Sequence, residues 1–223
     1  MIRKLLSLPL LLVAATAHAD GSPQWANAAG ADGAKCLAEL KAAFNGSAAK
    51  FTAHAPMTKP NKQGCGMPQG VTVTRGPAGI TWSPALEIDC TLAAELPKIE
   101  AIVQEEARAL LGGEIKRIET LGAYACRTSK GPLTTAYGGK GVLSEHAFGL
   151  AIDLKAFVPK KGKAVTIAKD WGKDTKAGEF LANVRYRLRK ETAITHVITP
   201  DYNAAHRDHL HVDRGLPWGW WAP

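Results

Sequence analysis

Residues 149–154 alternate between two kinds of side chain. Aliphatic residues occupy every second position, and two small residues and a carboxylate lie between them: Leu150, Ile152 and Leu154 against Gly149, Ala151 and Asp153. Because successive side chains of a strand point to opposite faces, this predicts a strand over 149–158 with one apolar and one open polar face. The alternation returns at 209–212, where two histidines alternate with Leu210 and Val212. Side by side, the two strands would bring their polar faces together.

Periodicity elsewhere predicts three helices and three further strands. Helices are expected over 32–44, over 176–191, and from Ser83-Pro84 to Leu111 with a bend near Pro97 and an end at Gly112-Gly113. Strands are expected at 71–74, 115–127 and 194–199. The pattern favours an α+β fold, in which an antiparallel sheet carries a site on one face and two or three helices pack on the other.

Three residues of the expected polar face have the chemistry of a zinc site. His146 precedes the first strand, Asp153 ends its polar face, and His211 lies on the second strand. Imidazole nitrogen and carboxylate oxygen bind zinc, and catalytic sites use three protein ligands with water as the fourth. Zinc lowers the pKa of that water from about 15.7 to about 7, which provides a nucleophile at neutral pH. His209 is placed to act as its general base.

Other polar residues stand beside these candidates. Asp208 or Asp213 could orient an imidazole from behind, as carboxylates commonly do around zinc. Ser144 is expected to form a loop hydrogen bond beside His146 rather than to act as a nucleophile. Taken alone, His209 and His211 also fit a surface strand with two solvated histidines. The two segments together favour the metal site.

Two sets of motifs carry a resemblance to known families. Ser144-x-His146-x2-Gly149-x-Ala151-x-Asp153, followed by His209-x-His211, resembles the zinc peptidases grouped as lysostaphin, D-Ala-D-Ala peptidases and sonic hedgehog. The chain is more similar to the bacterial extensin-like C-terminal domain family, from about Cys36 to Asp213. The residues that carry this second resemblance are Leu86-Glu87-x-Asp89-Cys90-x-Leu92-Ala93, Tyr124-x-Cys126-Arg127, Leu143-Ser144-Glu145-His146-Ala147, Asp170-Trp171 and His206-x-Asp208-His209-x-His211-x-Asp213.

The resemblance implies roles for individual residues. It implies zinc on His146, Asp153 and His211, with His209 as the catalytic histidine and His206 assisting it. Arg127 would stabilise the oxyanion that forms on the attacked carbonyl, a task suited to a fixed positive charge. A surface arginine paired with an acid is the alternative for this residue.

The first residues predict export. Met1–Ala19 has a positive start, a short apolar run and a small-x-small cleavage site, as expected of a signal peptide. The apolar run is too short to span a bilayer, although a retained anchor is an alternative. We therefore expect one domain over 20–223, secreted across the inner membrane to the periplasm or cell envelope, with no stable membrane insertion.

Four cysteines fit that compartment. In an exported chain, Cys36, Cys65, Cys90 and Cys126 suggest two disulfides with three possible connectivities. Pairs Cys36–Cys65 and Cys90–Cys126 are expected here. The bridge at Cys126 would then hold the neighbouring Arg127 in position.

Charge adds little to this picture. The chain has 28 Lys and Arg against 20 Asp and Glu, and removal of Arg3 and Lys4 with the signal peptide leaves a net charge of +6. This balance favours acidic partners such as anionic wall polymers. The basic runs at 160–163 and 185–190 are expected to be a solvated loop and helix face rather than a nucleic-acid site. We expect a monomer.

The expected function is that of a zinc-dependent peptidase that cuts the peptide stems or cross-links of peptidoglycan, with zinc-bound water as the nucleophile. A binding module for wall peptide or glycan, stabilised by the same zinc, is the alternative. A metal-dependent nuclease is less favoured because it would use more carboxylates at the metal. The Trp-rich tail at 217–221 is expected either to stack on sugar rings or to pack across the end of the sheet.

Overall fold

An eight-stranded sheet forms the centre of the computed structural model, which describes residues 33–129 and 143–215. Its strands are β1 Lys50–Ala53, β2 Gly70–Arg75, β3 Thr81–Asp89, β4 Ile115–Gly122, β5 Ala151–Pro159, β6 Val165–Thr166, β7 His196–Ile198 and β8 Leu210–Asp213. They lie in the order β1-β2-β3-β4-β5-β8-β7, and β6 pairs with β5. The predicted signal peptide and the Trp-rich tail lie outside the described residues.

The sheet is mixed rather than purely antiparallel. Strands β3 and β4 pair in parallel, and the other pairs are antiparallel. The parallel pair arises because a helical crossover joins these two strands instead of a hairpin. The prediction of an antiparallel sheet is therefore correct for the strands around the site and wrong for this one pair.

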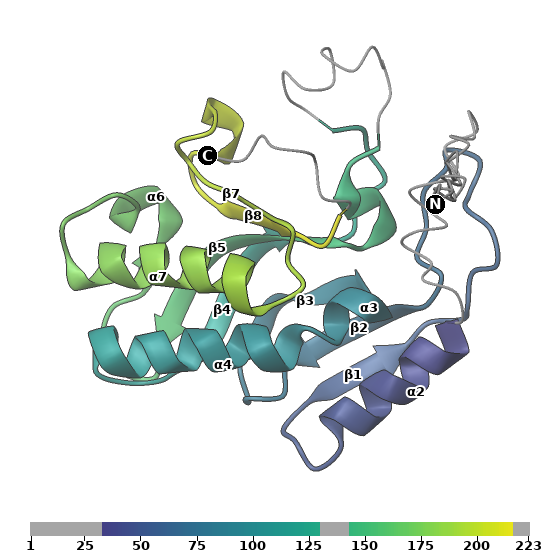
Figure 1. Cartoon of the computed structure of the whole chain (residues 1–223), viewed down its shortest axis with the longest axis horizontal. Helices are drawn as coiled ribbons and strands as arrows, with labels where there is room; N and C mark the ends of the chain where they lie inside the picture. Colours follow the sequence, from purple (N-terminus) through teal and green to yellow (C-terminus); the bar gives the residue numbers. More distant parts are fainter. Residues whose placement is uncertain (1–32, 130–142, 216–223) are drawn as a thin grey trace, which may run out of the picture.

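Five α-helices and three other helical turns complete the described elements. They are α2 Gly33–Phe44, α3 Cys90–Ala93, α4 Leu96–Glu106, the π-helical turn η1 Ala107–Leu111, the 3-10 turn η2 Glu145–Phe148, α6 Ile167–Asp170, α7 Lys176–Glu191 and the 3-10 turn η3 Ala204–His206. Helices α4 and α7 lie side by side against one face of the sheet (Figure 1). Phe157 of β5 meets Phe180 of α7 edge to face, with ring centroids 5.1 Å apart. The bounds of α7 match the prediction.

The long helix predicted from Ser83-Pro84 is wrong in its first half. Residues Thr81–Asp89 form β3, in which Leu86 and Ile88 are buried with the two-residue period of a strand. The helical part begins at Asp89, whose side chain accepts a hydrogen bond from Thr91 N as an N-cap. Pro97 then lies in the first turn of α4, where a missing N–H costs nothing, rather than at a bend.

Strands β5 and β8 separate an apolar face from a polar one, as predicted. Ile152 pairs with Val212 and Leu154 with Leu210, and all four side chains belong to the hydrophobic core. Asp153 pairs with His211 between them, so both point to the opposite face. A slip of one residue would exchange the faces, and burial of each aliphatic side chain contributes about 1.5–3 kcal/mol against that slip. The core therefore fixes which atoms meet at the site.

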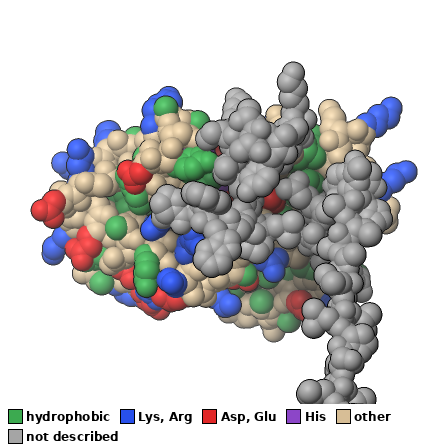
Figure 2. All heavy atoms as spheres, turned by 45° about the horizontal axis from the view of Figure 1, so that its top comes forward, with side chains coloured by type: hydrophobic (Ala, Val, Ile, Leu, Met, Phe, Trp, Pro, Cys, Tyr) green, Lys and Arg blue, Asp and Glu red, His purple; other side chains and the backbone are tan. Residues whose placement is uncertain are grey.

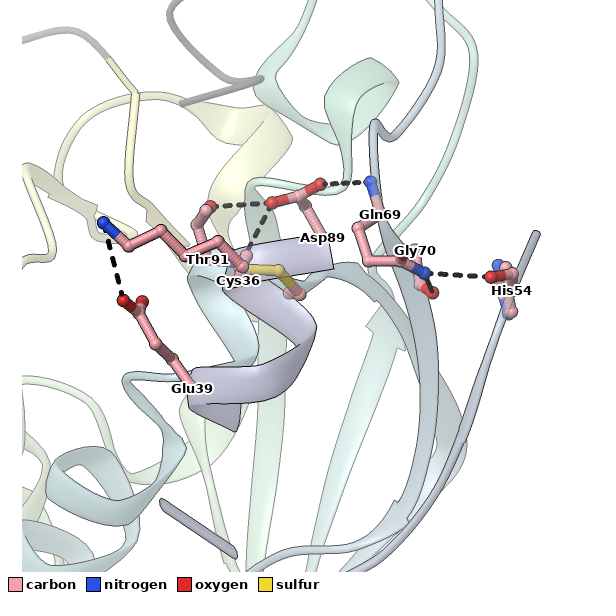
Figure 3. The surroundings of a disulfide bond; sticks show 9 residues. Cys36, Glu39, His54, Gln69, Gly70, Asp89 and Thr91 are labelled. Atoms are coloured by element: carbon pink, nitrogen blue, oxygen red, sulfur yellow. Dashed lines mark hydrogen bonds and ion pairs between the residues drawn. A yellow bond between two sulfur atoms is a disulfide. The ribbon is translucent and has the colours of Figure 1, made fainter. Parts of the chain in front are cut away.

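The disulfide pairing differs from the prediction. Cys36 bonds Cys90 and Cys65 bonds Cys126, with Cα–Cα distances of 6.1 and 5.7 Å. The predicted pairing joined cysteines that are close in sequence, whereas the fold packs α2 against α3 and brings Cys36 to the start of that helix. Figure 3 shows Cys36 in this position, beside the contacts of Asp89 with Thr91 and Gln69. Two disulfides favour an extracellular or periplasmic protein.

The surface carries both signs of charge. In the view of Figure 2, Lys and Arg side chains are interspersed with Asp and Glu over the described surface. The basic run 185–190 is not simply solvated, because Arg187 forms ion pairs with Glu105, Glu106 and Glu191. Among the described helices, none has the length and apolar character that a membrane crossing requires.

Candidate metal centre

Three ligand atoms converge at the boundary of β5, β8 and η2. His146 Nε2 lies 3.1 Å from both Asp153 Oδ1 and His211 Nδ1, and the latter two atoms are 3.0 Å apart. The three residues are buried, with exposed fractions of 2%, 9% and 8%. Zinc with ligands at about 2.0–2.1 Å in a tetrahedral arrangement places neighbouring ligand atoms about 3.3 Å apart. The spacing of these three atoms therefore fits residues that could hold one ion together.

In both imidazoles, the outer nitrogen, which faces away from Asp153, already has a hydrogen-bond partner. His146 Nδ1 contacts the carbonyl oxygen of Ala123, which can only accept a hydrogen, so this nitrogen must carry the proton. His211 Nε2 lies 3.1 Å from Asp213 Oδ2 and donates to it in the same way. When both histidines are neutral, His146 Nε2 and His211 Nδ1 each carry a lone pair, and both nitrogens face the carboxylate of Asp153. Such a set of acceptors needs a cation at its centre.

Without a metal, protons serve as that cation. Burial alone would raise the pKa of Asp153, but hydrogen bonds from His146 and His211 outweigh it and hold the pKa far below its usual range. Burial would lower the pKa of His211, yet Asp153 and Asp213 raise it to about 9. The pKa of Asp213 is held low, against the effect of burial, by its bonds to His196 and His211. Metal binding would therefore displace protons from the site.

A short helical turn positions His146. Ser144 caps η2, and its hydroxyl accepts from His146 N at 3.4 Å, so it makes the local hydrogen bond that the sequence suggested. Gly149 ends the turn with φ +66°, a left-handed conformation that favours glycine. A Cβ at this position would lie 2.3 Å from Met67 Sδ and 2.7 Å from Asp89 N. The turn can therefore reverse into β5 only with glycine here.

His209 stands beside the three candidate ligands. Its side chain is buried, with Nε2 3.6 Å from Asp153 Oδ1 and Nδ1 3.0 Å from Asp208 Oδ1. The hydrogen bond from His209 holds the pKa of Asp208 below its usual value. Both carboxylates named as possible orienting groups thus contact an imidazole: Asp208 contacts His209, and Asp213 contacts His211.

His206 lies one ring further out. Its ring centroid is 5.1 Å from that of His209 and 6.0 Å from that of His211, and its Nδ1 lies 2.8 Å from Asn203 Oδ1. Burial lowers the pKa of His206 to about 4, and the charges of His211, His209 and Arg127 act in the same direction. The imidazole is therefore neutral at physiological pH and offers Nε2 as an acceptor.

Arg127 is the outermost of the candidate residues. Its side chain is exposed, and its main-chain carbonyl accepts a hydrogen bond from Ser144 N at 3.0 Å. The backbone of Arg127 is thus attached to the segment that carries His146. Its guanidinium contributes to the electrostatic environment of His206.

Some of the contacts around the site had no sequence signal. The carbonyl of Ala123 fixes the tautomer of His146, but any residue could supply a carbonyl. His196 lies with Nδ1 2.9 Å from Asp213 Oδ1 and extends the polar network. Glu145 is buried nearby, and burial followed by the charge of Asp213 raises its pKa to about 7. The sequence pattern did not single out Glu145, because the zinc-site pattern assigns the role of ligand to its neighbour His146.

Within the residues that the structure describes, His146, Asp153 and His211 form a buried group able to hold one metal ion on a mixed α/β fold. The family described as extensin-like protein C-terminus matches residues 34–219, which is most of the chain, so the chain belongs to this family. No curated protein matches the chain. No solved structure matches it either.

Proposed function

We propose that this protein is an exported zinc-dependent peptidase that hydrolyses amide bonds in the peptide part of peptidoglycan. The observation that carries the proposal is the convergence of one carboxylate and two imidazole lone pairs, with each imidazole oriented from behind and a third imidazole beside them. Two histidines and a carboxylate are a catalytic zinc set, because the fourth position remains for water. A structural zinc would be expected to have four protein ligands.

The position of His209 supports an open fourth site. The group of ligand atoms lying within 4.8 Å of one another contains His146, Asp153 and His211, and His209 is not part of it. Its Nε2 is nevertheless only 3.6 Å from the Asp153 oxygen. General-base catalysis requires a base that lies beside the metal without being one of its ligands.

Each residue has its own role in the proposed hydrolysis. A bound zinc ion would supply an acidified water and would polarise the substrate carbonyl. His209 takes a proton from the attacking water, and Asp208 holds the imidazole in the tautomer that allows this. As the new C–O bond forms and the C–N bond breaks, His209 gives the proton that it has taken to the leaving amine, and the neutral His206 beside it assists by accepting a hydrogen bond at Nε2. Arg127 contributes positive charge where the oxyanion develops.

The substrate class rests on the motifs. The spacing from Ser144 to Asp153 and the His209-x-His211 pair resemble those of zinc peptidases that act on bacterial cell walls. Two disulfides are compatible with a location outside the cytoplasm, where peptidoglycan lies. Neither feature distinguishes a D,D bond from an L,D bond, so the test must identify the bond as well as the activity.

A digest of purified peptidoglycan tests the proposal. The mature protein is incubated with zinc, with a chelator, or as the His209→Ala variant, and the released fragments are identified by mass spectrometry. New fragments that disappear in both controls are expected, and their masses name the bond. If zinc binds with one equivalent per chain but nothing is cut, the peptidase proposal fails and the wall-binding module takes its place.

A further inference from the structure

The Cys65–Cys126 disulfide joins two chain segments that hold η2 from both sides. Gly66, which follows Cys65, donates its N–H to the carbonyl of Ala147 at 2.9 Å. Ala125, which precedes Cys126, donates its N–H to the carbonyl of His146 at 3.0 Å. The disulfide thus links the two segments that donate to consecutive carbonyls of η2, the turn that carries the candidate metal ligand His146.

Residues 123–127 make two more contacts with the same turn. The Ala123 carbonyl meets His146 Nδ1, and the Arg127 carbonyl accepts from Ser144 N at 3.0 Å. This segment therefore contacts the imidazole of His146, the main chain of His146, and Ser144, the residue that caps η2. Because β4 ends at Gly122, a continuous strand ladder does not support these contacts.

The other side of the bridge is a pre-formed loop. Asn61 Oδ1 accepts from Gln63 N and Cys65 N, each at 2.9 Å, and Asn61 N donates to the Cys65 carbonyl at 2.8 Å. Cys65 itself is fully buried. The disulfide therefore attaches the segment 123–127 to a firm anchor, and it limits how far this segment can move from His146.

The two sulfurs differ in access to solvent. Cys126 is exposed, whereas Cys65 has an exposed fraction of 0%. A thiolate from outside can therefore attack Cys126 Sγ. In the other bridge, Cys90 is buried and Cys36 is partly buried. That bridge attaches α2, and it does not join the two segments that flank η2.

We propose that Cys65–Cys126 is a redox-dependent clamp that keeps His146 in its metal-binding position. This inference rests on the metal site of the proposed function. With the bridge closed, His146 and its tautomer are pre-organised, so little ordering is needed on metal binding. An external dithiol of the thiol–disulfide oxidoreductase class can open it in a two-electron exchange. The S–S bond breaks, both cysteines become thiols, and the dithiol becomes a disulfide. The segment 123–127 is then released, and metal affinity falls.

Two double variants separate the clamp from general stabilisation. Cys65→Ala with Cys126→Ala removes the clamp, and Cys36→Ala with Cys90→Ala removes the other bridge. The two loops are of similar length, with sequence separations of 61 and 54, so the loss of loop-closure entropy is similar. Zinc affinity is measured by competition with a chromogenic chelator. The clamp variant is expected to lose about 10–100-fold, as for other groups that orient a zinc ligand, and the control less than about threefold.

Hydrogen exchange provides a second readout on metal-free wild-type protein, and it needs no variant. The amides of Gly66, Ala125 and Ser144 are hydrogen-bonded across the clamp. After reduction with a phosphine, these three should exchange at least about tenfold faster than in the oxidised protein. Unchanged exchange at all three, or equal zinc loss in both double variants, overturns the clamp. Oxidised wild-type protein that binds no zinc but shows the exchange effect would instead contradict the metal site and the proposed function.

Discussion

Two clusters of charged side chains in this molecule are built in opposite ways. On α7, the guanidinium of Arg187 donates to Glu105, Glu106 and Glu191 at 2.7–2.9 Å, and thereby ties α7 to α4. Each hydrogen there points from a donor to an acceptor. At the junction of β5, β8 and η2, the three central atoms of His146, Asp153 and His211 are acceptors, because the outer imidazole nitrogens carry the protons and donate them in hydrogen bonds to Ala123 O and Asp213 Oδ2.

The difference shows how to distinguish a structural charge cluster from a candidate binding site. The Arg187 cluster is complete, since its cation is a side chain of the protein. The histidine cluster instead has three facing ligand atoms that could hold a metal ion. Burial sharpens the contrast, because the Glu105 and Glu191 side chains are 52% and 46% exposed, whereas the side chains of the three candidate ligands are at most 12% exposed. A buried set of facing acceptors is costly without its ion.

Removal of the central negative charge should have the largest effect. Asp153→Asn keeps the shape of the side chain and removes its charge, so zinc affinity is expected to fall by at least about 1,000-fold, more than the loss typical of outer groups. Chelator competition measures the change. Arg187→Met serves as the matched control from the complete cluster, and a comparable loss of affinity in that variant would refute the distinction.

Glu100 offers a second buried carboxylate whose contacts are complementary. Trp82 Nε1 and Ala78 N donate to it at 2.8 and 2.7 Å, and burial raises its pKa from 4.5 to about 7. A raised pKa in the folded protein stabilises it below pH 4.5, and this contribution is lost as the pH rises through about 7. We therefore expect the free energy of unfolding to fall with pH across this window by on the order of 3 kcal/mol more than in Glu100→Gln. Urea unfolding at several pH values measures the slope, and parallel slopes would contradict the assignment.

The orienting carboxylate of the histidine cluster should have an intermediate effect. Asp213→Asn weakens the acceptor that fixes His211 Nε2, so zinc affinity is expected to fall about 10–100-fold. Asp201→Asn is the control, because Asp201 is a carboxylate that accepts from Trp171 Nε1 and Thr199 Oγ1 rather than from a candidate ligand. Equal affinities in the two variants would show that Asp213 does not orient the metal site.

The smallest effect is expected from the complete cluster itself. Arg187→Met removes three ion pairs that lie partly in solvent, so the loss of stability should be about 1 kcal/mol, or about 2–4 °C in Tm. Calorimetry on the metal-free protein measures it. A Tm loss above about 10 °C would mean that α4 and α7 depend on this cluster far more than its exposure indicates.

Much of the site follows from local sequence pattern. The alternation of Leu150, Ile152 and Leu154 with Asp153 is enough to assign the faces of β5, and the same holds for β8. Each strand requires only its own residues for this inference. The helix α7 can also be predicted from its own residues, because its apolar positions follow an uninterrupted helical period.

Other features depend on contacts between distant segments. Ser83-Pro84 carries the sequence signs of a helix start, yet pairing with β2 and β4 makes Thr81–Asp89 a strand. The cysteine pairs follow from the packing of α2 on α3 and of the loop at Cys65 on the segment after β4, neither of which has a local signature. The tautomer of His146 depends on a main-chain carbonyl, which no residue type marks.

Anomalous diffraction at the zinc edge tests the metal centre most directly. Crystals of the oxidised protein grown with one equivalent of zinc should show a single strong peak about 2.0–2.2 Å from His146 Nε2, Asp153 Oδ1 and His211 Nδ1. The fourth position should be occupied by water, with His209 Nε2 in hydrogen-bond reach of it. A peak elsewhere, or none at this triangle under those conditions, would contradict the assignment of the three residues as a zinc site.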